Sequence, residues 1–193
     1  FLYGGLIMKK SYIVLGIIII LLLVGAAVMF SNHERSQNNT NQTDVQTVSQ
    51  NGVVLKFPSD WVIAKAETND TVVAIADSKS IDSSSKYGRV NVNVEKRDLN
   101  GESLNTFVNQ TYSSILSNSS NQLVSLGNST AVNGKEAYEA EYLSDIGNNT
   151  KEHRAVWVES NNQVYVILCT APQGQFESVN KYFNYIISNI EIS

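Results

Sequence analysis

The sequence predicts an α+β fold, an α/β/α sandwich in which a predominantly antiparallel central sheet is covered by two amphipathic helices. Three observations support this fold class. Strand-like alternation recurs over residues 52–98 and 122–171, short Asn-containing turns join four of the strands in pairs, and two segments change to the helical period. We expect one domain over residues 51–193, which is long enough to bury a substantial core.

The strands before the first helix are predicted at residues 52–58, 71–77 and 89–98. The first strand ends at Pro58, because proline has no N–H to donate to a ladder. In the third strand, valines occupy one face, and Asn91, Asn93 and Glu95 occupy the other. This pattern predicts a sheet that is covered on one side and exposed on the other.

The short stretch from Pro58 to Trp61 is either a binding site or the corner at which a strand stops. Ser59 and Asp60 favour a turn, and Trp61 carries a large apolar surface that suits the edge of a core. We therefore interpret it as structural.

The later elements are predicted as helices at residues 103–118 and 175–188 and strands at residues 122–132, 135–144, 152–160 and 163–171. Ser103 is the candidate N-cap of the first helix. The turns Asn133-Gly134 and Asn161-Asn162 predict two hairpins. The last strand is apolar on both faces, which indicates a central position.

The N-terminal part contains an uncharged apolar run, Tyr12–Phe30, which is long enough to cross a bilayer as a helix. Lys9 and Lys10 precede the run, so the positive-inside rule predicts a single-pass protein of the cell membrane with its C-terminal domain extracytoplasmic. The alternative is a signal peptide that is cleaved near Gly25–Ala27. We favour a retained anchor, since apolar residues continue past that point.

The segments beside this run have separate interpretations. Residues 1–11 form an N-terminal cytoplasmic segment, and residues 1–7 are expected not to be translated if synthesis starts at Met8. Residues 31–50 are polar and predict a disordered stalk, the last residues of which are candidates for joining the first strand.

Composition limits the partners. The part after Phe30 has 18 acidic residues and 12 lysines and arginines, a net charge of −6, which argues against nucleic acid as a partner. Cys169 is the single cysteine, so the domain has no internal disulfide.

The order of these segments resembles that of a known family. The segments are GVVLKFPSDWVIAKAE, SLNTFVNQTYSSIL, NGKEAYEAEYLS, HRAVWVESNNQVYVILCTAPQGQF and KYFNYIISNIEI. They occur in the order found in PsbP-like domains, the family of an extrinsic subunit of photosystem II. The resemblance covers residues 51–193 and implies an α/β/α sandwich that acts as a non-catalytic accessory or binding module. It also implies kinship with PsbP-related proteins of non-photosynthetic prokaryotes, archaea included.

Catalytic groups are scarce. His153 is the one histidine of the domain, and Cys169 lies on a predicted central strand, where a buried and inert thiol is the expected state. The chain has no nucleophile elbow and no glycine-rich phosphate loop. We therefore predict that the protein is not an enzyme and has no organic cofactor.

A divalent-ion site is the competing interpretation of one hairpin. Glu139 and Glu141 share one face of their strand, and His153 begins the next strand. If the strands pair, carboxylate oxygens and an imidazole could converge on a hard or borderline ion. The alternative is an acidic face in contact with solvent.

Seven Asn-x-Ser/Thr sequons favour a glycosylated surface protein, although a composition rich in Asn and Ser would also produce several. The candidate asparagines are Asn38, Asn41, Asn69, Asn109, Asn118, Asn128 and Asn148.

Taken together, the residues predict a membrane-anchored, extracytoplasmic, non-catalytic module of a prokaryotic, archaeal-type cell envelope. Its expected partners are the membrane, through the N-terminal helix, and another envelope protein. The alternative is a stand-alone surface domain that binds a divalent ion or a small ligand.

Overall fold

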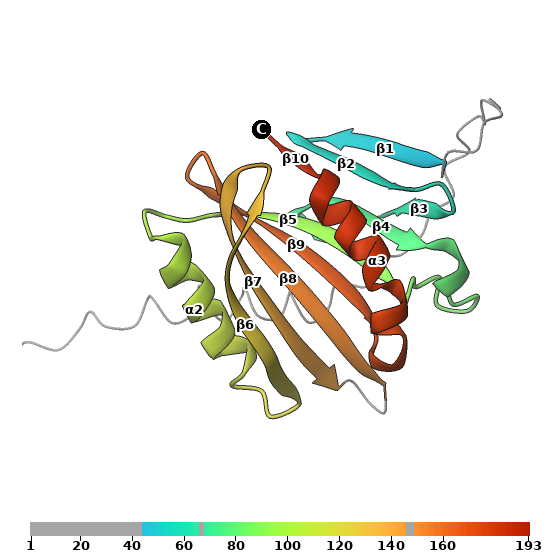
Figure 1. Ribbon diagram of the computed structural model, residues 1–193. Helices are drawn as coiled ribbons and strands as arrows, with labels where there is room; N and C mark the ends of the chain where they lie inside the picture. The colour runs from blue at the N-terminus through green and yellow to red at the C-terminus, as the bar shows by residue number, and fades with distance from the viewer. Residues whose placement is uncertain (1–43, 66–67, 146–148) are drawn as a thin grey trace, which may run out of the picture.

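The computed structural model describes residues 44–65, 68–145 and 149–193 (Figure 1). Seven strands form the main sheet in the order β3-β4-β5-β9-β8-β7-β6, and each neighbouring pair is antiparallel. Their bounds are β3 Trp61–Ala64, β4 Thr71–Asp77, β5 Asn91–Asp98, β6 Asn121–Val132, β7 Lys135–Asp145, β8 Thr150–Ser160 and β9 Gln163–Pro172. The predicted antiparallel sheet is confirmed.

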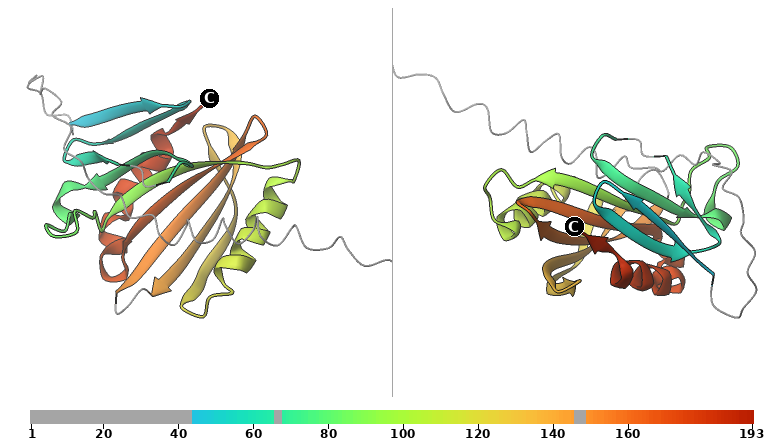
Figure 2. Two further views of the ribbon diagram at one scale, coloured as in Figure 1. Left: turned by 180° about the vertical axis from the view of Figure 1, so that it is seen from behind. Right: turned by 90° about the horizontal axis from the view of Figure 1, so that it is seen from above.

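Two α-helices, α2 (Leu104–Ile115) and α3 (Gln173–Asn189), lie on opposite faces of this sheet (Figure 2). Ser103 caps α2 as predicted, because its hydroxyl accepts a hydrogen bond from the Thr106 N–H at 3.2 Å. A short 3₁₀ helix, η1 (Ser78–Ser80), follows β4. The prediction of two helices covering the sheet is confirmed.

Strand β9 separates two hydrophobic cores. Every residue from Val164 to Ala171 is buried, and the side chains alternate between the faces. Val164, Val166 and Leu168 pack with α2, whereas the residues between them pack with α3. The sequence therefore placed β9 correctly at the centre of the sheet.

Both predicted hairpin turns are present. Asn133 and Gly134 have φ of 50° and 75°, and Asn161 and Asn162 have φ of 55° and 61°. Positive φ at both central residues is the geometry whose twist matches antiparallel strands, and Asn and Gly adopt it at low cost.

A second, three-stranded sheet was not predicted. It has the order β1-β2-β10, with β1 Val45–Gln50, β2 Val53–Pro58 and β10 Glu191–Ile192 (Figure 1). Val53 and Val54 of β2 pair with β10, and Lys56 forms an ion pair with Glu191 at 3.3 Å. The first predicted strand thus lies outside the main sheet and joins the two ends of the described chain.

The end of the predicted stalk is part of this sheet. Strand β1 is mostly exposed, and its backbone pairs with β2 over its whole length. The Gln46 amide also donates to the carbonyl oxygens of Ser59 and Trp61, each at 2.9 Å. The ordered domain therefore begins before residue 51, because pairing with β2 supplies the order that the polar side chains lack.

The stretch Pro58–Trp61 is structural, as interpreted from the sequence. Pro58 ends β2, and Trp61 begins β3 with 2% of its surface exposed. The Trp61 ring contacts Tyr182 and Phe183 of α3, with centroids 6.2 and 6.4 Å away. The corner therefore fastens α3 to the edge of the sheet.

Neither helix of the described residues is long and apolar enough to cross a membrane. The predicted anchor at residues 12–30 and the segment at residues 1–11 lie outside the described residues. The anchor therefore remains a prediction.

We expect Trp61→Ala to lower the free energy of unfolding by about 3–5 kcal/mol, because it removes a buried ring that packs on two aromatic side chains of α3. Urea denaturation of the full chain measures this loss. Ile63→Ala is the matched control, since Ile63 lies on the same strand and is 46% exposed. Equal losses for the two variants would contradict the role assigned to Trp61.

Candidate functional site

The three predicted metal ligands lie on paired strands but not on one face. Strands β7 and β8 pair as expected, with Glu141 opposite Arg154 and Tyr142 opposite His153. Because successive side chains alternate, His153 lies on the α2 face of the sheet, whereas Glu139 and Glu141 lie on the α3 face. The hairpin therefore separates the predicted ligands.

Each of these side chains has its own protein partner. Glu139 accepts hydrogen bonds from the Arg154 guanidinium at 2.6 and 3.2 Å, and Arg154 also donates to Asn180 of α3. Glu141 accepts a hydrogen bond from the Ser125 hydroxyl at 3.5 Å. The described residues contain no group of three His, Cys, Asp or Glu side chains able to hold a metal ion. The predicted grouping is thus corrected by the register of the strands.

His153 is locked in a buried hydrogen-bonded position. Its Nε2 lies 2.7 Å from the Ser144 hydroxyl and its Nδ1 lies 2.9 Å from the Thr170 hydroxyl, while the ring stacks on Tyr142 at 4.6 Å. Burial, helped by the charge of Lys151, lowers the pKa of His153 to about 3. A neutral imidazole with both nitrogens engaged serves the packing of β7, β8 and β9.

Cys169 and His153 do not form a nucleophile and base. Cys169 lies on the α3 face of β9, opposite to the face that carries His153. Burial raises the pKa of the Cys169 thiol to about 12. The two groups named by the sequence as catalytic candidates are therefore kept apart by the sheet and held in unreactive protonation states.

Three of the sequon asparagines, Asn69, Asn109 and Asn118, are exposed. Asn128 belongs to β6, and Asn38, Asn41 and Asn148 lie outside the described residues. The exposed positions are accessible to a glycosyltransferase, and use of any sequon remains a prediction.

The polar face of β5 is where the structure departs most from expectation. Asn91, Asn93 and Glu95 were expected to face solvent, and they are 0%, 1% and 1% exposed. The Asn93 amide donates to Asn91 Oδ1 at 2.9 Å, and the Asn91 amide donates to the Gly88 carbonyl at 2.8 Å. Alternation showed that these side chains share a face, but not that the face is buried.

This buried row continues into a chain of ion pairs at the end of β5. Arg97 donates to Glu95 Oε2 at 2.9 Å and also pairs with Asp70, in the turn before β4. Burial raises the pKa of Glu95, although the neighbouring Arg97 charge acts in the opposite direction. The guanidinium therefore only partly compensates the buried carboxylate.

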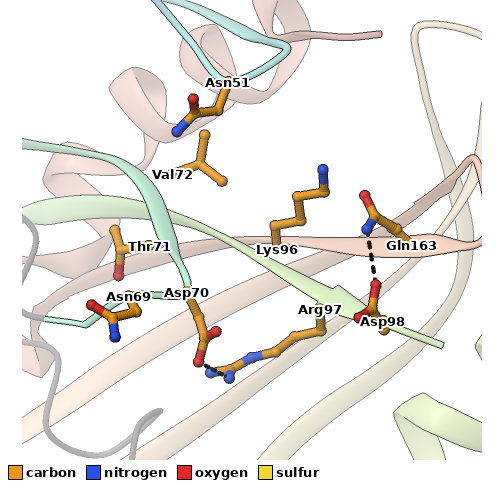
Figure 3. A pocket seen from close by; sticks show the side chains of 9 residues that line it. All are labelled: Asn51, Asn69, Asp70, Thr71, Val72, Lys96, Arg97, Asp98 and Gln163. Atoms are coloured by element: carbon orange, nitrogen blue, oxygen red, sulfur yellow. Dashed lines mark hydrogen bonds and ion pairs between the residues drawn. The ribbon is translucent and has the colours of Figure 1, made fainter. Parts of the chain in front are cut away.

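A pocket of about 580 Å³ opens beside this ion-pair chain (Figure 3). Its lining residues are Asn51, Asn69, Asp70, Thr71, Val72, Lys96, Arg97, Asp98 and Gln163. Figure 3 shows Arg97 reaching toward Asp70, whereas Lys96 is directed away from this pair. Lys96 instead lies over the Tyr165 ring, 5.6 Å from its centroid. The pocket and the buried row together form the candidate site.

Comparison with known protein families assigns the scaffold. A family model described as PsbP-like protein matches residues 13–192. The chain belongs to the PsbP-like family.

Solved structures agree with this family. Cyanobacterial PsbP from Synechocystis has a TM-score of 0.59 and 14% identity, and the match covers 82% of this chain and 98% of that one. LpqN, a protein involved in cell envelope biogenesis of Mycobacterium tuberculosis, has a TM-score of 0.54 and 13% identity, over 78% of this chain and 91% of that one. No curated protein gives a significant match. At these identities the similarity shows the PsbP-like fold alone.

The site on this PsbP-like scaffold was missed because it has no motif. Its polar groups come from the turn before β4, from β5 and from the start of β9, which are far apart in the sequence. One signal was available. Glu95 lies two positions before Arg97 on one predicted strand, and side chains two residues apart on a strand share a face, which suggests an ion pair between them.

We expect His153 to make the fold less stable in acid. The unfolded pKa is about 6.5 and the folded pKa is depressed, so the unfolded state binds more protons below pH 6.5. The folded state therefore loses about 1.4 kcal/mol per pH unit below that value, down to its own pKa. The variant His153→Gln lacks this titration, so we expect its free energy of unfolding to be below that of the wild type at pH 7 and to approach the wild-type value as the pH falls to 4. Urea denaturation at several pH values measures this difference. A deficit that stays constant would show that His153 is not buried as a neutral group.

Cys169 should resist alkylation in the folded protein. The raised pKa reduces the thiolate fraction roughly a thousand-fold, and burial blocks access as well. We expect iodoacetamide to react at least a hundred times more slowly with the native chain than with the chain in denaturant, as followed by intact mass. Rates within tenfold of each other would contradict the buried position.

Proposed function

We propose that this chain is a non-catalytic, membrane-anchored PsbP-like module that binds another protein of an archaeal or bacterial cell envelope. The observation that carries the proposal is the open edge of the main sheet at strand β6. The extracytoplasmic location follows from the apolar run Tyr12–Phe30 and the lysines before it. Glycosylation at the exposed sequons belongs to the same proposal.

Strand β6 is long, and its edge has none of the charged or proline residues that commonly prevent pairing with another chain. It pairs with β7 on one side and has no neighbour on the other among the described residues. Its sequence, NQLVSLGNSTAV, contains no charged residue and no proline. Native proteins commonly place lysine, proline or inward charges on exposed edges to prevent pairing with other chains.

Apolar side chains accompany the free backbone edge. Val124 and Leu126 are 51% and 48% exposed, whereas Leu123 packs against the α2 core. The register of β6 against β7 shifts on both sides of Ser125–Gly127, and between these shifts the pairing is regular. A short extended segment can therefore add to the sheet here and cover Val124 and Leu126.

The occupant that we propose is an extended segment of a partner protein with apolar side chains at alternate positions. An uncharged edge sets no charge requirement on that segment, so apolar contacts and backbone hydrogen bonds would provide the affinity. LpqN, a protein involved in cell envelope biogenesis, has the same fold, and this similarity supports a location in the cell envelope. The buried, unreactive states of His153 and Cys169 support a role without catalysis.

The stand-alone ligand-binding function is favoured by a different observation, the pocket beside Arg97. This second function does not compete for the same surface, because β5 and β6 are separated by three strands of the main sheet.

In-cell crosslinking of the tagged full-length chain, followed by mass spectrometry of the membrane fraction, tests the docking role. We expect one reproducible envelope partner, with its crosslinks at β6, and at least a tenfold loss of the partner with Leu126→Lys. The added charge would be buried by an incoming strand.

Gln110→Lys on the exposed side of α2 is the matched control and should retain the partner. Equal loss from both variants, or recovery of the protein alone, would contradict docking at β6. Crosslinks between two copies of β6 would contradict a partner protein at this edge and would identify its occupant as a second copy of this chain.

A further inference from the structure

We propose that a second pocket, between the loop after η1 and the start of α3, binds a phosphate group through Arg89 and Lys151. This pocket has a volume of about 570 Å³, and none of its lining residues belongs to the pocket beside Arg97. Its walls come from three segments, which are the loop between η1 and β5, the start of β8, and the junction of β9 with α3. The inference goes beyond the docking role at β6, and either proposal can fail without the other.

The register of β8 against β9 places a lysine at the start of α3. Lys151 is the Cα partner of Pro172, the N-cap residue of α3. Its ammonium donates to the Tyr87 hydroxyl at 3.1 Å and lies 4.7 Å from the centroid of the same ring. Lys151 is therefore held at the pocket by a loop residue, and two of its three N–H donors remain for a ligand.

The loop between η1 and β5 places Arg89 at the same pocket. A Cβ on Gly88 would lie 2.5 Å from the Ala76 Cβ, so glycine lets this end of the loop lie directly against β4. Asp82 Oδ1 accepts hydrogen bonds from the N–H and hydroxyl groups of Ser84 and Ser85, which lower the pKa of Asp82. The Asp82 carboxylate is thus engaged within its own loop.

The charges around the pocket conflict with the polarity of α3. A helix N-terminus carries a partial positive charge, and acidic residues in the first turn usually stabilise it. The first turn of α3 has no acidic residue, and Pro172 provides no side-chain cap. Arg89 and Lys151 add two positive charges here, and neither takes part in the ion pairs found among the described residues. Asp82 is the one carboxylate among the lining residues, so a positive charge remains in excess and favours an anion as ligand.

The available donors indicate which anion fits. The guanidinium of Arg89 can donate to two oxygens of one phosphate, and the Lys151 ammonium can donate to a third. The first N–H groups of α3 have no partner within the helix. No other part of the described chain lies within 4 Å of the point that a Cβ on Gly174 would occupy, so an oxygen can approach these groups. A phosphate dianion matches the two cations, whereas a carboxylate offers two oxygens and a single charge.

Titration of the ¹⁵N-labelled full-length chain with inorganic phosphate at constant ionic strength, followed by NMR, tests the proposal. We expect saturable shifts of the Gly174 amide and of the Arg89 side-chain N–H, and at least tenfold weaker binding of acetate. Glycerol 3-phosphate and dihexanoyl phosphatidic acid distinguish the sources of the phosphate. Tighter binding of the phosphatidic acid would indicate a lipid headgroup, and equal binding a soluble phosphate ester.

Two variants localise the site. Arg89→Gln and Lys151→Gln each remove one positive charge from the pocket, and each should weaken phosphate binding at least tenfold. Lys86→Gln is the matched control, because it removes a charge from the same loop at a residue that does not line the pocket. It should bind phosphate as the wild type does.

A pair of variants at Gly174 separates a ligand site from a structural feature. Gly174→Glu places a carboxylate beside the two cations, so it should abolish phosphate binding and raise the midpoint of thermal unfolding. Gly174→Gln has the same shape without the charge, and it should keep phosphate binding and raise the midpoint less. Neither side chain is strained, because the φ of Gly174 is not positive and the space around it is open.

Any of four results would overturn the proposal. They are the absence of a saturable shift with phosphate, equal binding of acetate, unchanged affinity in folded Arg89→Gln and Lys151→Gln, and an equal loss of affinity in Lys86→Gln.

Discussion

The alternation of side chains along β8 and β9 is the constraint on which the rest of this structure depends. Both strands are buried on both faces, so neighbouring positions in the sequence belong to different cores. Cys169 and Thr170 are adjacent residues, yet one packs under α3 and the other bonds to His153 under the α2 face. The sheet thereby acts as a partition, and only groups on the same side of it can cooperate.

Local elements were predictable because short-range chemistry specifies them. Ser103 caps its helix, and Asn133-Gly134 closes its hairpin, without help from distant residues. The end of the stalk was a candidate for joining the first strand, and it does so as β1. The length of β1 and the presence of β10 were not predictable, because β1 is polar, β10 has two residues, and both owe their order to pairing with β2. Pairing between the ends of a chain leaves no pattern in either segment alone.

The candidate site could be predicted in its parts but not in its arrangement. The alternation of β5 correctly placed Asn93 and Glu95 on one face, and the pairing of β7 with β8 was foreseen. The sequence does not show which faces become buried, so Asn93 and Glu95 were assigned to solvent. It also does not fix register, and one position of register decides whether His153 joins Glu141 or Tyr142.

Strand β2 lies between β1 and β10, and this arrangement has a consequence for the timing of folding. The ion pair of Lys56 with Glu191 joins residues 135 positions apart, and the Trp61 ring is covered by α3, near the end of the chain. A ribosome adds roughly 5–20 residues per second, so the apolar side chains of β2 and β3 wait on the order of 10 s for their cover. Throughout that interval the first third of the nascent chain exposes apolar surface, and this is the part that is most prone to aggregate before the last helix is made.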